Sequence, residues 1–105
     1  MRNHELDIIL LGFEVYGYSR GAVATLAGCS ESTVLRVALT GRAAPDTAKA
    51  FELIADQAAA DGEMVREVGE RAYKLIPPYE LADVERRRGY IRVHRAKLLE
   101  GIDVR

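Results

Sequence analysis

The densest group of side chains that could bind another molecule lies toward the end of the sequence. Residues 86–99 contain no acidic side chain, and their basic side chains are Arg86, Arg87, Arg88, Arg92, Arg95 and Lys97. Cationic groups at this density can bind a polyanion. Four interpretations are open: a solvated helix face, a second contact to a DNA backbone, an arginine-rich RNA-binding helix with Tyr90 stacked on a base, and a surface for an acidic protein.

The residues that could support catalysis or metal binding form no such cluster. His4 and His94 are far apart in the sequence, and neither has a cysteine or carboxylate at metal-ligand spacing, so we expect no metal site. The single cysteine, Cys29, has no basic neighbour to activate its thiol and is expected in the core. No glycine-rich nucleotide-binding motif is present. The sequence therefore predicts a protein that is not an enzyme and needs no cofactor.

Length and composition favour one helical domain. The chain has 105 residues and 3 prolines, 49% of its residues are hydrophobic, and alanine, leucine, glutamate and arginine dominate. The formal net charge of −1 conceals the basic segment described above. The sequence has no apolar run long enough to span a membrane, no recognisable signal peptide and no possible internal disulfide. We therefore expect a cytoplasmic location and no membrane partner.

Apolar side chains spaced three and four residues apart predict an all-α fold of five or six helices. The expected helices cover residues 3–16, 20–27, 31–40, 46–60, 63–76 and 80–101. Asn3, Ser19 and Ser30 are the expected N-caps of the first three, and Asp46 or Thr47 that of the fourth.

Proline and glycine residues give the other helix boundaries. The pair Pro77 and Pro78 should end the fifth helix. Gly41 is the expected stop of the third helix, and Gly89 is a possible break in the last one.

The second and third expected helices are joined by only three residues, Gly28, Cys29 and Ser30, within the segment VATLAGCSESTVLRVALTGR. Two helices that meet near a right angle need a small residue at the crossing, such as Ala24, and a turn residue that tolerates positive φ, such as Gly28. Val34 and Val37 are three residues apart and would face the core together. Arg36 would then point outward.

This segment resembles the helix-turn-helix of phage-repressor-like (Cro-type) and LacI-type DNA-binding domains. It follows their pattern V-A-x-x-A-G-V-S-x-x-T-V-x-R-V almost position by position. It departs at Leu26, where tyrosine is common, and at Cys29, where valine or isoleucine is common; both changes are compatible with the pattern. The resemblance covers residues 3–60 and is specific over residues 20–42.

The resemblance implies a lambda-repressor-like DNA-binding domain over residues 1–60, in which the helix of residues 31–40 lies in the major groove. The implied base-contacting residues are Glu31, Ser32 and Arg36. The implied phosphate-contacting residues are Arg20, Thr25, Ser30, Thr33, Arg42 and Lys49. A purely structural role is open for Ser30, as a helix cap, and for Glu31, because the first turn of a helix favours an acid.

One such domain makes few DNA contacts, so the resemblance also implies a homodimer on a near-palindromic operator. The helical region of residues 61–105 is expected to serve dimerisation or partner binding. One candidate interface has heptad-like spacing and consists of Leu81, Val84, Ile91, Leu98 and Ile102. An alternative lies on the preceding helix and consists of Val65, Val68 and Tyr73.

The sequence therefore predicts a homodimeric, sequence-specific transcriptional regulator of bacterial or phage type that binds double-stranded DNA and represses by occupying its operator. Three alternatives are open. The protein could be an activator that contacts RNA polymerase through its C-terminal region, an antitoxin-like protein-interaction module, or an RNA-binding protein that uses residues 86–97.

Overall fold

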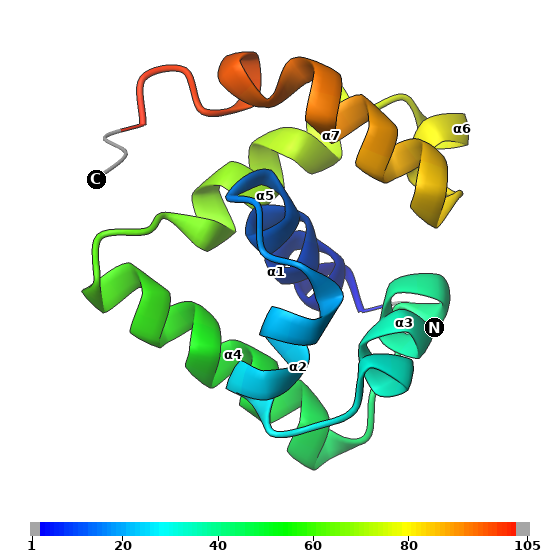
Figure 1. The fold of residues 1–105 in the computed structure, drawn as a ribbon, viewed down its shortest axis with the longest axis vertical. Helices are drawn as coiled ribbons and strands as arrows, with labels where there is room; N and C mark the ends of the chain where they lie inside the picture. Colours follow the sequence, from blue (N-terminus) through cyan, green and yellow to red (C-terminus); the bar gives the residue numbers. More distant parts are fainter. Residues whose placement is uncertain (1–2, 103–105) are drawn as a thin grey trace.

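The computed structural model describes residues 3–102, which fold into helices and contain no β-strand (Figure 1). The two regions expected from the sequence, residues 1–60 and 61–105, include residues 1–2 and 103–105, which lie outside the described range. The helices within it are α1 (His4–Val15), α2 (Arg20–Ala27), α3 (Glu31–Thr40), α4 (Pro45–Ala60), α5 (Val65–Leu75), α6 (Pro78–Leu81) and α7 (Val84–Leu98). The all-α prediction is confirmed.

The described residues contain seven helices, so the expected count of five or six is too low. The additional helix is α6, which is four residues long. Pro77 and Pro78 end α5 as expected, but Pro78 then starts α6, because proline suits the first position of a helix, where no intrahelical N–H bond is needed.

The predicted N-caps of the first three helices are confirmed. The side-chain oxygens of Asn3, Ser19 and Ser30 each accept a hydrogen bond from a backbone N–H two or three residues further on. Each cap satisfies an N–H group that would otherwise lack a partner at the helix start.

Other boundaries also differ from the sequence prediction. The fifth helix begins at Val65 rather than at residue 63, and the segment expected as one helix over residues 80–101 is divided into α6 and α7. Helix α4 begins at Pro45 with Ala44 as its N-cap, not at Asp46 or Thr47, because Pro45 occupies the first helical position. Gly89 does not interrupt α7, which runs unbroken from Val84 to Leu98.

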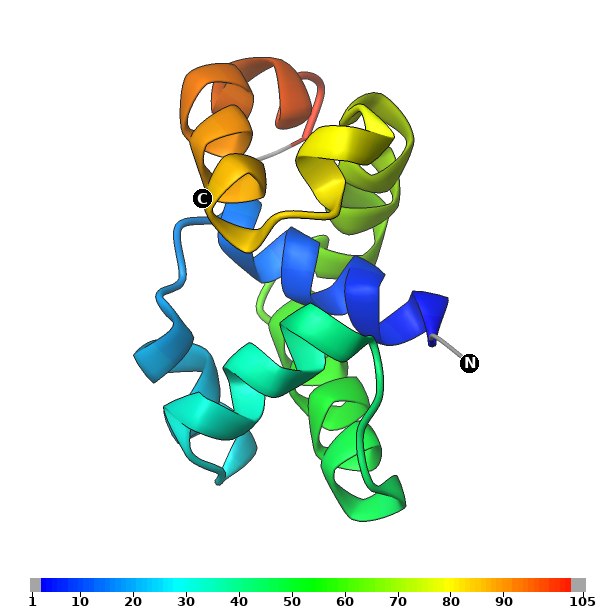
Figure 2. The same cartoon turned by 90° about the vertical axis from the view of Figure 1, so that its right-hand side faces the viewer.

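Helix α1 lies in the middle of the molecule, with α2, α3 and α4 on one side of it and α5, α6 and α7 on the other (Figure 2). Leu6, Ile9 and Phe13 of α1 belong to a core cluster shared with α2, α3 and α4. Leu11 and Val15 belong to a second cluster shared with α5 and α7. The apolar residues on two faces of this helix therefore serve two cores.

Helices α1 and α5 cross at very short range through two glycines. A Cβ atom placed on Gly12 would overlap the backbone carbonyl of Val65, and one placed on Gly69 would overlap the backbone carbonyl of Ile8. Only glycine permits this approach, which holds the C-terminal helices against α1.

Two tyrosines tie the loop after α1 to the loop before α5. The Tyr18 hydroxyl donates a hydrogen bond of 2.6 Å to Oε1 of Glu63, and the Tyr16 hydroxyl accepts one of 2.9 Å from the Met64 N–H. The hydrogen bond to the Glu63 carboxylate, helped by partial burial, raises the pKa of Tyr18 to about 12.

The two stripes considered as dimer interfaces belong largely to the core of the single chain. Ile91 and Leu98 of α7 are buried in the second cluster, against which Leu81 and Ile102 pack, and Val84 is buried in the first. The interpretation of this stripe as a free dimer surface is therefore wrong.

The alternative stripe on α5 is not a free surface either. Val65 and Val68 are buried, and the Tyr73 hydroxyl is 3.0 Å from Nδ1 of His4 on α1. A heptad-like spacing identifies an apolar face, and here the face is covered by the chain itself.

Over residues 3–102, no single helix is long and apolar enough to cross a membrane. Helices α2 and α3 reach the required length and hydropathy only when taken together across a bend of 105°.

Candidate nucleic-acid interface

Helices α2 and α3 form a corner, residues 20–40, in which the two helices are bent by 105° across a three-residue connection. Gly28 ends α2 with φ of 71°, the left-handed conformation expected of it from the sequence. Ala24 is buried on α2, and Val34 and Val37 are buried on α3. The corner is therefore held to the core by its inner face, and its outer face is left to solvent.

The outer face of α3 carries Ser32 and Arg36, both exposed. Neither side chain forms a hydrogen bond or ion pair with another residue in the range 3–102. Arg36 points outward because Val34 and Val37 point inward, as their spacing predicts. A guanidinium without an intramolecular partner retains its donors for a ligand.

Glu31, at the start of α3, lies against the start of α2. A Cβ atom on Gly21 would be 3.3 Å from Oε1 of Glu31. The carboxylate is therefore close to the first turn of both helices, where the helix dipoles favour a negative charge. This position supports the structural role of Glu31, which is to stabilise the corner.

The predicted phosphate-contacting hydroxyls also form local hydrogen bonds. Ser30 Oγ accepts from the Thr33 N–H at 3.1 Å and lies 3.0 Å from Thr33 Oγ1. Thr25 Oγ1 donates to the Gly21 carbonyl at 2.9 Å. All three residues are near the solvent-facing side of the corner, so these bonds fix the hydroxyl positions without burying them.

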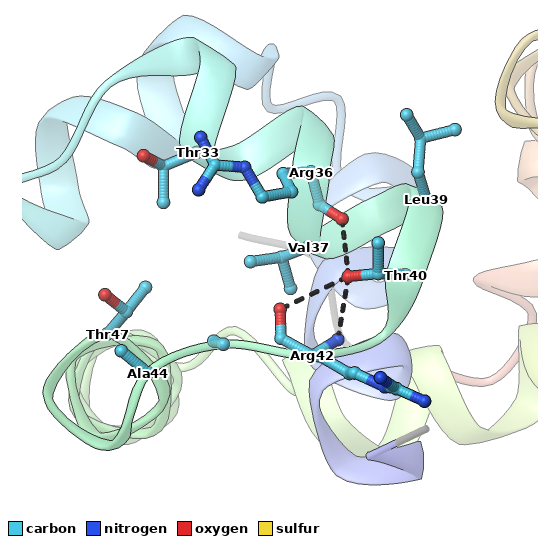
Figure 3. A pocket seen from close by; sticks show the side chains of 9 residues that line it. Thr33, Arg36, Val37, Leu39, Thr40, Arg42, Ala44 and Thr47 are labelled. Carbon is cyan, nitrogen blue, oxygen red and sulfur yellow. Dashed lines mark hydrogen bonds between the residues drawn. The ribbon is translucent and has the colours of Figure 1, made fainter. Parts of the chain in front are cut away.

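A wide hollow of about 730 Å³ separates the C-terminal half of α3 from the start of α4 (Figure 3). Its lining includes Thr33, Arg36, Thr40, Arg42 and Thr47 and no carboxylate. In Figure 3 the Arg36 guanidinium extends toward Thr33, and that of Arg42 points in the opposite direction. The hollow is therefore flanked by two cations and several hydroxyls.

Thr40 sets the course of the chain as it leaves α3. Its Oγ1 donates to the Arg36 carbonyl at 2.8 Å and accepts from the Arg42 N–H at 3.2 Å. These bonds place Arg42 beside the hollow. Thr40 and Thr47 are not among the predicted site residues; the signal that identifies them is their position on either side of the loop of residues 41–44, with Thr40 directly before it and Thr47 in the first turn of α4.

Two predicted phosphate-contacting residues lie apart from the hollow. Lys49 is exposed on α4 and does not contribute to the lining. Arg20, at the start of α2, has its Nη2 atom 3.8 Å from Oε1 of Glu85 on α7. The structure thus brings together Thr33, Arg36 and Arg42 of the predicted set.

The basic residues of α7 do not form one surface. Arg87 is buried, and its Nη2 and Nε atoms donate to the two carboxylate oxygens of Glu14 at 2.9 and 3.3 Å. Its assignment to a basic patch is therefore wrong, because a solvent-facing role requires exposure. Another group, Arg88, Arg92 and Arg95, faces the turn between α1 and α2.

Arg86 and Lys97 are exposed and lie on another face of α7. Counted at 3.6 residues per turn, they are about half a turn away from Arg88 and Arg92. The segment of residues 86–97 therefore presents its positive charges in two directions.

Cys29 is half-buried in the connection between α2 and α3 and packs against the core, rather than lying fully inside it as expected. Burial raises the pKa of its thiol, which keeps the sulfur protonated at neutral pH. Among the described residues, no group of three or more His, Cys, Asp or Glu side chains is placed to hold a metal ion.

Comparison of the chain with protein-family models, curated proteins and solved structures finds no match. The assignment of a function therefore depends on the geometry of the corner and its neighbouring side chains.

Proposed function

We propose that the protein is a sequence-specific transcriptional regulator that binds double-stranded DNA, with α2 and α3 as a helix-turn-helix within a lambda-repressor-like domain. The observation that carries the proposal is the outer face of α3, which projects Arg36, without a side-chain partner among residues 3–102, from a 105° corner beside a hollow whose described lining has no carboxylate. Helices joined at about 90–120° by a short glycine-containing turn are typical of this motif.

In this proposal α3 enters the major groove and Arg36 contacts a base edge. A guanidinium can donate two parallel hydrogen bonds to O6 and N7 of guanine, and the Ser32 hydroxyl can contact several bases. Glu31 contributes less to base recognition than the sequence implies, because its carboxylate lies against Gly21 in the first turn of α2.

The hollow between α3 and α4 supplies contacts to the DNA backbone. Arg42, Thr33 and Thr47 offer donors to phosphate oxygens on the edge of the groove that α3 would occupy. Arg20, Thr25 and Ser30 lie along the same corner, and Lys49 extends the contacts along α4. Such contacts position the protein without selecting a sequence.

A single α3 contacts few base pairs, so the proposal includes a homodimer on a near-palindromic operator and repression by occupancy. The interface must use residues other than the two stripes that the core covers. Exposed apolar side chains on the α5 to α7 side of the molecule, Leu75, Tyr79 and Val93, are available for it.

Selection of bound duplexes from a random DNA library tests the proposal. The wild-type protein should enrich a near-palindrome. Arg36→Ala should bind the enriched site about 5- to 150-fold more weakly, which corresponds to the loss of one bidentate contact of about 1–3 kcal/mol.

Lys74→Ala is the matched control, because Lys74 is an exposed cation on α5 whose ammonium is 3.9 Å from Glu70. Its affinity should equal that of the wild type. Failure to enrich any sequence, or enrichment of the same sequence by Arg36→Ala with unchanged affinity, would refute base recognition by α3.

A further inference from the structure

A small cleft beside α7 gathers three guanidinium groups. Arg88, Arg92 and Arg95 line it from α7, and Tyr18 and Ser19 line it from the turn that leads into α2. We call these five residues the α7 cleft. Its volume is about 160 Å³. In Figure 2 the chain between α1 and α2 descends from the end of α1, next to α7.

The three arginines share one face of α7 because they are four and three residues apart. Like charges at this spacing repel one another and destabilise a helix. Arg95 has a structural partner, since its Nε donates to the Val15 carbonyl at 2.8 Å at the C-terminal end of α1. Within residues 3–102, Arg88 and Arg92 have no side-chain hydrogen bond or ion pair.

The nearby carboxylates do not neutralise these two cations. Glu14 also lines the cleft, but both of its oxygens accept hydrogen bonds from Arg87 on the buried side. Glu85 lies outside the lining and is 3.8 Å from Arg20. The described lining of the cleft therefore has an excess of positive charge, because its one carboxylate, Glu14, is already paired with Arg87.

We propose that the α7 cleft binds a phosphate group, held by the guanidiniums of Arg88 and Arg92 with Arg95 at its edge. Arginine suits this ligand because its planar fork of donors matches phosphate oxygens. The volume is well below the roughly 300–1,000 Å³ of sites for larger ligands, so the cleft holds one small group.

The phosphate can come from the DNA backbone or from a free phosphate compound. The DNA source rests on the proposed function, in which Tyr18 and Ser19 directly precede a helix that crosses the DNA backbone. The α7 cleft would then add a phosphate contact outside the α2–α3 corner and lengthen the DNA segment that one protomer covers.

The experiment has two arms. In the first, inorganic phosphate is added to ¹⁵N-labelled wild-type protein at constant ionic strength, and the Nε–Hε signals of the arginines are followed by NMR. The signals of Arg88 and Arg92 should shift and saturate, while that of Arg86 should not move.

In the second arm, affinity for a mixed-sequence duplex is measured over a range of salt concentrations. The double variant Arg88→Ala/Arg92→Ala is compared with Arg86→Ala/Lys97→Ala, which loses the same charge from another face of α7. The first variant should reduce the slope of log affinity against log salt by about 0.9, the value for one phosphate, and the control should retain the wild-type slope.

Each outcome decides the proposal. Saturable shifts with a reduced slope support a DNA phosphate in the cleft, and saturable shifts with an unchanged slope, or with no DNA binding at all, support a free phosphate compound. Absence of saturable shifts at Arg88 and Arg92 overturns the proposal, whether or not the slopes of the two double variants are equal. Enrichment of a sequence that depends on Arg36 would in that case still support the proposed function, so the two can fail separately.

Discussion

Replacement of Arg87 tests whether the ion pair between α7 and α1 stabilises the fold. The Arg87 side chain is 2% exposed and that of Glu14 is 18% exposed, and two hydrogen bonds join them. Arg87→Met removes the cation and leaves the Glu14 carboxylate beside a low-dielectric core. An unpaired charge in such a place is costly, because neither water nor a counter-ion solvates it fully.

The expected loss is large for a domain of this size. Removal of one partner of a buried pair costs about 3–5 kcal/mol, out of a typical stability of about 5–15 kcal/mol. Unfolding entropy near the midpoint is about 2.1 cal/mol/K per residue, which for 105 residues gives about 0.22 kcal/mol/K. Arg87→Met should therefore lower Tm by about 14–23 °C.

Thermal and urea unfolding, followed by circular dichroism, measure this effect. Arg87→Lys should recover only part of the stability, since an ammonium cannot make the paired bonds of a guanidinium. The double variant Arg87→Met/Glu14→Met should be more stable than Arg87→Met, because no unpaired charge remains. Arg86→Met is the exposed control and should change stability by less than about 0.5 kcal/mol. A loss below about 1 kcal/mol for Arg87→Met, or no recovery in the double variant, would refute the argument.

Two further predictions concern a pair of glycines and a tyrosine. Gly69→Ala should destabilise the protein by about 1–3 kcal/mol or more, because the new Cβ overlaps the Ile8 carbonyl, whereas Gly89→Ala in open space on α7 should stabilise it by up to about 1 kcal/mol. Changes of the same sign in urea unfolding would contradict this. Tyr18 should ionise near its raised pKa of about 12 in a spectrophotometric titration, and Glu63→Gln should return the value toward 10. The raised pKa belongs to the folded state. The hydrogen bond from protonated Tyr18 to Glu63 therefore contributes its full stability below pH 10, and this contribution is lost as the pH rises through 12. Ionisation of Tyr18 near pH 10 in the native protein would contradict the hydrogen bond to Glu63.

Local chemistry made the corner predictable from the sequence. The expected ranges of residues 20–27 and 31–40 match α2 and α3, because serine caps and glycine stops act on the backbone within a few residues. The start of α4 was misplaced because Asp46 is a better side-chain cap than Ala44, yet Pro45 fits the first helical position.

The long-range contacts were not predictable in the same way. Arg87 and Glu14 are 73 residues apart in the sequence, and nothing local distinguishes Arg87 from its neighbours, the exposed Arg86 and the half-buried Arg88. The side chains of a basic run are usually exposed to solvent. Which of them is buried depends on how another helix packs against α7, and the local sequence does not indicate this. The same reasoning applies to Ile91 and Leu98, whose spacing indicates an apolar face but not whether a second chain or α1 covers it.

The ion pair and the two proposed DNA contacts are linked through the end of α1. Glu14 and Val15, which bind Arg87 and Arg95, are the last residues before the loop that leads to α2. The contacts that fix α7 on α1 therefore also fix the α7 cleft relative to the start of α2. Since a packed core resists continuous deformation, the distance between the cleft and α3 is set by the fold rather than by the ligand. If both surfaces bind one DNA molecule, the phosphate in the cleft and the base contacted by Arg36 must then lie at a fixed spacing, and the α7 cleft would restrict the register in which α3 enters the groove.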